Sequence, residues 1–137
     1  MSFDLFFQPV THGEPLGISR DELRSLFPIL EDESKPDYRK IQYSSLNTCH
    51  FGLTASPSSI DLLSAFYVER PCADPQFWEA VFRVLASGPT VLYFPGGPPI
   101  VARMEFAAGL PQDILSSLGE PRCVHSGSEI QKIIRES

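Results

Sequence analysis

The sequence is short of basic residues, and we expect no targeting signal at its N-terminus. Its 11 Lys and Arg stand against 17 Asp and Glu, so the formal net charge is -6 at pH 7. This charge repels nucleic-acid phosphates and anionic lipid and favours basic partners. The opening MSFDLFFQPV lacks the positive segment of a secretory signal, and Asp4 interrupts its apolar run. We therefore expect a cytoplasmic protein that binds neither nucleic acid nor membranes.

Cysteine is also scarce. The three residues Cys49, Cys72 and Cys123 are an odd number at wide spacing, which does not indicate a disulfide framework. Structural zinc sites usually contain Cys-x-x-Cys pairs, whereas here Cys49 is followed directly by His50 and Cys123 precedes His125 by two positions. Neighbouring residues on a strand point to opposite faces, so Cys49 and His50 are poorly placed to bind one ion. The sequence therefore predicts neither a disulfide nor a metal site.

Catalytic signatures are missing as well. The chain has no Gly-x-Ser-x-Gly nucleophile elbow and no His-Glu-x-x-His motif, and it has only three histidines to serve as general bases. A pairing of one cysteine with one histidine stays open, because such pairs form in space and not along the sequence. We predict a protein that is not an enzyme and needs no cofactor.

The stretch TVLYFPGGPPIVARMEF, residues 90–106, looks most like a site. A phosphate-binding loop needs backbone amides, a Lys and a following helix, but Pro98 and Pro99 lack amide protons and no Lys follows. The pattern instead predicts a hairpin between strands TVLYF and IVARM. We expect the exposed loop at Pro95, Gly96 and Gly97 to contribute to a protein-binding surface.

Length and composition predict one globular domain over residues 1–137, because 42% of the residues are hydrophobic. Strands are predicted near residues 2–8, 38–43, 48–54, 60–69, 90–94, 100–104 and 122–125, and helices after Ser19, Asp74, Pro111 and Ser126. Whether the last strand joins the main sheet stays open. Both the first strand and the strand at 60–69 are apolar on both faces, which indicates positions inside the sheet. We predict an α+β fold: a single-layer antiparallel or mixed sheet of about five to six strands with helices mainly on one face.

A second candidate surface is the acidic stretch EDESKPD. Its carboxylates have no apolar periodicity, so they belong to a solvated connection. Clustered carboxylates accelerate association with a cationic partner. We therefore predict that this stretch docks such a partner through Glu31, Asp32, Glu33 and Asp37.

Three segments give the chain a family resemblance: YSSLNTCHFGL, LLSAFYVERP, and the Phe-Trp helix that leads into VLYFPGGPPIVA. With these segments the chain resembles small uncharacterised bacterial cytoplasmic proteins of the immunity type, which are encoded beside secreted toxins. The resemblance covers about the middle half of the chain. It implies a protein that neutralises a toxin by binding it, and it implies no particular binding residues.

The predicted function is thus non-enzymatic binding of a protein partner, which could be a basic toxin, by an immunity-type or antitoxin-like protein. One alternative is a small-molecule-binding or enzymatic α+β domain with a pocket lined by Tyr67, Trp78 and Tyr93. Another is a self-associating subunit, so both a monomer and a homodimer stay open.

Overall fold

A computed structural model describes residues 4–9, 18–30, 38–44, 47–56, 59–71, 74–87, 90–108, 110 and 112–136. Its described strands are β1 (Asp4–Pro9), β2 (Ile18–Ser19), β3 (Ile29–Leu30), β4 (Tyr38–Ser44), β5 (Asn47–Ser56), β6 (Ser59–Glu69), β7 (Thr90–Tyr93), β8 (Ile100–Val101) and β9 (Arg122–Cys123). Its described helices are α1 (Arg20–Leu26), α2 (Pro75–Ser87), α3 (Met104–Ala107), α4 (Gln112–Leu118) and α5 (Gly127–Glu136). None of these helices has both the length and the apolar character needed to cross a bilayer.

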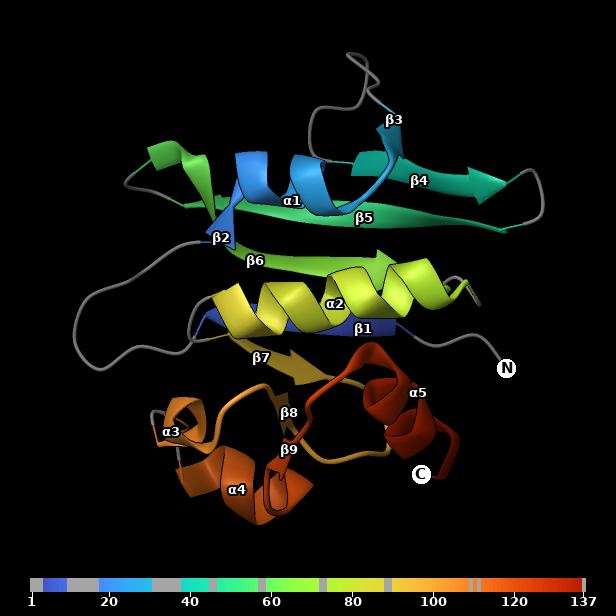
Figure 1. Ribbon diagram of the computed structural model, residues 1–137. Coiled ribbons are helices and arrows are strands. Elements are labelled where there is room, and N and C mark those ends of the chain that lie inside the picture. The colour runs from blue at the N-terminus through green and yellow to red at the C-terminus, as the bar shows by residue number, and fades with distance from the viewer. Residues whose placement is uncertain are drawn as a thin grey trace.

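The described strands form one sheet in the order β3-β4-β5-β6-β1-β7-β8-β9, with β2 paired to β6 (Figure 1). All of the pairings are antiparallel except that between β8 and β9, so the sheet is mixed and the fold is α+β, as predicted. The predicted number of five to six strands is wrong, because nine strands are present in the described residues. Four of the nine contain only two residues, too few to give a recognisable alternation in the sequence.

The N-terminal strand lies in the interior of the sheet. β1 pairs with β6 through Phe7 and Phe66 and with β7 through Phe7 and Leu92. The prediction of interior positions for β1 and β6 is confirmed, since each has a described strand on both sides. β1 thereby joins strands that are far apart in the sequence.

Helices α1, α2 and α5 cover one face of the sheet (Figure 1). On β1 this face presents Leu5 and Phe7, which are fully buried. The longest of the described helices, α2, begins as predicted at Pro75, and the side chain of Asp74 caps it by accepting a hydrogen bond of 2.8 Å from the Gln76 amide. The main core consists of the apolar side chains between these helices and the sheet.

Helix α5 meets α2 at a close contact. Gly127 opens α5, and a Cβ atom there would overlap the backbone of Trp78 and Glu79. The Glu79 carboxylate accepts a hydrogen bond of 2.9 Å from the Gly127 amide, which satisfies a free donor at the start of α5. Glycine thus lets the two helices approach, and Glu79 fixes their contact.

The predicted strand IVARM is wrong in its second half. β8 ends at Val101, and α3 begins at Met104. Phe106 and Ala107 of α3 pack with α4 against a smaller apolar cluster around Val91 and Val101, on the face opposite to α2. A short run of apolar residues fits either structure, and the apolar surface beneath α3 favours the helix. Helices therefore lie mainly on one face, as predicted, while α3 and α4 cover the other face only at the β7–β9 end.

Candidate binding surface

The sheet face opposite α2 is left open by the described helices over β4, β5, β6 and β1. Strand alternation turns Phe6 toward this face, while its neighbours Leu5 and Phe7 are fully buried on the other. Phe6 is 43% exposed, and Gln8 on the same face is also exposed. We call this face the open sheet face.

Three aromatic residues form a row that runs from the open sheet face to its border with the α3–α4 cluster. The strand register places Phe6 opposite both Tyr67 of β6 and Tyr93 of β7. The rings of Phe6 and Tyr67 are tilted by 37°, with centroids 6.3 Å apart. Gly52 of β5 lies opposite Tyr67, and the Tyr67 ring occupies the space that a side chain at Gly52 would take. We call Phe6, Tyr67 and Tyr93 the aromatic row.

Charged residues form a second line beside the aromatic row. Asp4 lies directly opposite Glu69, and Glu69 lies opposite His50, which in turn lies opposite Lys40. The two carboxylates are thus at the β1 end of this line, and the groups that can carry positive charge are at the β4 end. Like charges in directly opposed positions of a sheet repel one another, so a cation beside Asp4 would be favoured there.

The loop after β7 is a tight turn, as the sequence predicted. The Gly97 amide donates a hydrogen bond of 3.4 Å to the Phe94 carbonyl, and Gly96 has φ of +83°. Pro at the second position and a positive φ at the third define a type II turn, in which glycine is favoured at the third. Pro95 and Gly96 are exposed. Because β7 ends where antiparallel β1 begins, this turn lies at the same end of the sheet as Asp4.

The burial of the Tyr93 phenol can be tested through the pH dependence of stability. Burial against the α3–α4 cluster raises the pKa of Tyr93 above its ordinary value of 10.0. Above pH 10.0 the unfolded chain releases the phenol proton while the folded protein still holds it, so the free energy of unfolding falls as pH rises. We expect Tyr93→Phe to make this alkaline fall shallower than in the wild type, as measured by urea unfolding between pH 8 and 11. Equal slopes for the two proteins would contradict a half-buried phenol.

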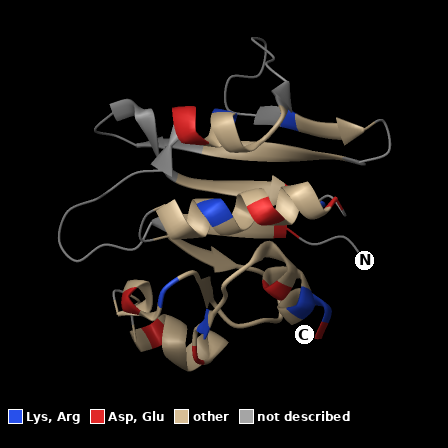
Figure 2. Cartoon of the chain, in the orientation of Figure 1, with Lys and Arg blue, Asp and Glu red and all other residues tan. Residues whose placement is uncertain are grey.

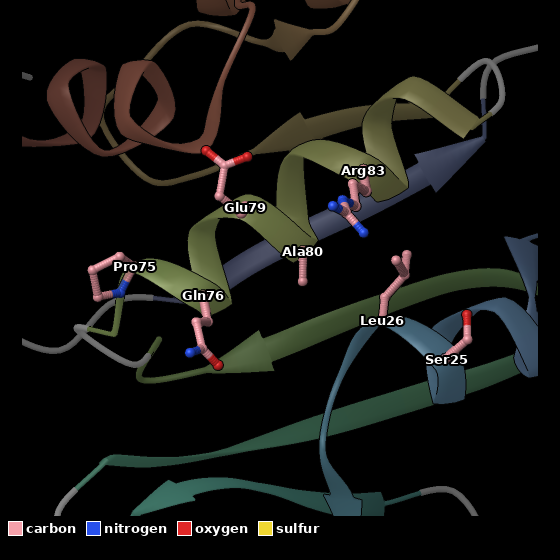
Figure 3. A pocket seen from close by; sticks show the side chains of 7 residues that line it. All are labelled: Ser25, Leu26, Pro75, Gln76, Glu79, Ala80 and Arg83. Carbon is pink, nitrogen blue, oxygen red and sulfur yellow. The ribbon is translucent and has the colours of Figure 1, made fainter.

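The described residues also line a groove of about 340 Å³ between α1 and α2. Figure 3 shows Leu26 and Ala80 facing one another across it. Its hydroxyl and carboxylate are already used within the fold, because Ser25 donates to the Glu22 carbonyl over 2.8 Å and Glu79 accepts from the Gly127 amide. Its other polar side chains are those of Gln76 and Arg83, which are exposed. The lining residues are Ser25, Leu26, Pro75, Gln76, Glu79, Ala80 and Arg83.

The predicted aromatic pocket is wrong. Trp78 is a residue of α2 and is buried in the main core, whereas Tyr67 and Tyr93 belong to the opposite face of the sheet. Alternation along the strands separates them, because side chains on opposite faces cannot line one pocket.

The other predicted site residues have different outcomes. Pro95, Gly96 and Gly97 form the type II turn beside the open sheet face, whereas Glu31, Asp32, Glu33 and Asp37 lie outside the described residues. Cys49 is buried in the main core on the face that His50 does not share. Within the described part of the chain, no three His, Cys, Asp or Glu side chains cluster as metal ligands would.

Sequence reasoning missed Phe6, Asp4 and Glu69. The signal for Phe6 was present, since two adjacent phenylalanines on a strand must point to opposite faces. The segment DLFFQ does not reveal which face the helices cover, and Asp4 and Glu69 are 65 positions apart (69 minus 4) in the sequence. Only the pairing of β1 with β6 brings these two carboxylates together.

The described surface carries charges of both signs, with Lys and Arg interspersed among Asp and Glu in the view of Figure 2. The outermost strands β3 and β9 have two residues each, so they offer few backbone groups for pairing with a second copy of the chain.

No protein-family model matches the chain, and no curated protein or solved structure shows significant similarity to it.

Proposed function

We propose that the protein is a non-enzymatic, immunity-type binding protein that neutralises a basic protein toxin by docking it on the open sheet face. The observation that carries this proposal is the half-exposed Phe6, set in a row with Tyr67 and Tyr93. Aromatic side chains provide a large share of the binding energy at protein interfaces, so Phe6, the exposed member of the row, is the expected central contact.

Three further features support this proposal. The type II turn at Pro95–Gly96 fixes an exposed loop at one end of the row, so binding would cost little ordering of that loop. The formal charge of -6 favours a basic partner. The resemblance to immunity-type proteins supplies the class of partner.

The aromatic row predicts a large effect of one substitution on binding. We expect Phe6→Ala to weaken the affinity for the partner by about thirtyfold, because it removes a central apolar contact. Leu118→Ala is the matched control, since Leu118 is 37% exposed at the C-terminal end of α4 and is not among the described residues of the apolar cluster that Tyr93 contacts, so its loss should change the affinity by less than about twofold.

The experiment uses the tagged full chain as bait in a lysate of its own organism, at low and high salt. The expected result is a stoichiometric basic protein that wild-type and Leu118→Ala baits retain and the Phe6→Ala bait loses. That partner should arrest growth when expressed alone, and co-expression with the wild-type chain should restore growth. A partner that binds the Phe6→Ala protein as tightly as the wild type, or that is not toxic, would overturn the proposal.

A further inference from the structure

We infer that the partner presents an arginine side chain to the corner of the open sheet face formed by Asp4, Phe6, Tyr67 and Glu69. This inference rests on the proposed function and specifies the chemistry that the surface recognises. We call these four residues the arginine corner.

The geometry of the arginine corner follows from the register of β1 and β6. Asp4 is opposite Glu69, and Phe6 is opposite Tyr67, so all four side chains project from the same face. Directly opposed Cβ atoms are about 5 Å apart, and residues two positions apart along a strand are about 7 Å apart. The carboxylates of Asp4 and Glu69 therefore lie two residues along the strands from the rings of Phe6 and Tyr67.

The electrostatics of the corner favour a cation. Asp4 lies directly opposite Glu69, and a positive group placed beside Asp4 would reduce the repulsion between the two carboxylates. Glu69 and His50 each have other interactions within the chain, so the Asp4 carboxylate carries the main part of the inference. The turn at Pro95 and Gly96, which carries no charged side chain, lies at the same end of the sheet as Asp4.

The rings beside the carboxylates favour arginine over lysine. A guanidinium is planar, stacks on aromatic faces and donates two parallel hydrogen bonds to one carboxylate, whereas the ammonium of lysine is a compact and strongly hydrated charge. Phe6 is exposed enough for such stacking, and cation-π contact with an aromatic ring adds to the attraction of the carboxylate. A single arginine can thus stack on the Phe6 ring and donate hydrogen bonds to the Asp4 carboxylate.

The test does not need the natural partner. Acetyl-Gly-Arg-Gly-amide is titrated to millimolar concentration into the isotope-labelled full chain and followed by two-dimensional NMR. The same peptide with citrulline in place of arginine has nearly the same shape without the charge. We expect the arginine peptide to shift amide signals around residues 4–7 and 66–69, and the citrulline peptide to bind at least about fivefold more weakly.

A pair of variants with equal changes in net charge locates the site. Asp4→Asn should weaken binding of the arginine peptide by about five- to tenfold, whereas Glu120→Gln, in the exposed connection before β9, should leave it within about twofold. The inference is overturned if citrulline binds as well as arginine, if the shifts fall elsewhere or are absent, or if the two variants behave alike. These outcomes leave the proposed function standing as long as a toxic partner still requires Phe6.

Discussion

Replacing Phe7 by alanine is expected to lower the free energy of unfolding by about 3 to 5 kcal/mol. Phe7 is fully buried in the interior strand β1, and its ring stacks on Phe66 with centroids 4.2 Å apart and an interplanar angle of 8°. Phe66 in turn contacts the edge of Phe51 on β5 at 5.5 Å. The substitution would open a cavity beneath α2 that this aromatic cluster cannot fill without moving. Urea unfolding monitored by circular dichroism measures the loss.

The adjacent residue is the matched control. Phe6→Ala removes the same atoms from the same strand, but on the open sheet face, where the side chain is already 43% exposed. It should cost less than about 1 kcal/mol of stability while weakening partner binding. Equal losses of stability for the two variants would show that the two faces of β1 are not covered as described.

The second large effect is expected at the crossing of α2 and α5. We expect Gly127→Ala to lower the free energy of unfolding by about 2 to 3 kcal/mol, because the added methyl group overlaps the backbone of Trp78 and Glu79. Backbone atoms in the middle of a packed helix cannot yield as the end of a long side chain can. Moving α5 away would also lengthen the hydrogen bond from the Gly127 amide to Glu79. Thermal and urea unfolding both report this change.

Alanine is ordinarily a better helix former than glycine, which makes the sign of this effect informative. Without the close contact, Gly127→Ala would stabilise α5 by up to about 1 kcal/mol. Lys132→Ala, at an exposed position of the same helix, should change stability by no more than about 0.5 kcal/mol. A stabilised Gly127→Ala protein would rule out the described approach of the two helices.

Local sequence signals were sufficient for many of the elements. Asp74 with Pro75 predicted the start of α2, and the alternation around Ile41 and Phe51 predicted the β4–β5 hairpin, because capping and period-2 patterns depend only on neighbouring residues. The Pro-Gly-Gly-Pro-Pro turn was also predicted, since the type II geometry requires these residue types. The bounds of strands as short as β8 and β9 were predicted incorrectly, because two residues are too few to show an alternating pattern.

The sequence by itself determined the α+β class, the helix boundaries set by caps, the turn at Pro95–Gly97 and the negative charge. Only the tertiary structure decided that β1 pairs with both β6 and β7, and that Phe7 rather than Phe6 lies under the helices. Side-chain alternation along a strand requires the rings of Phe6 and Phe7 to point to opposite faces, but which face is covered depends on where α1, α2 and α5 pack. The candidate surface depends on the same long-range pairing, because Asp4, Phe6, Tyr67 and Glu69 become neighbours only when the two ends of a long chain segment meet in one sheet.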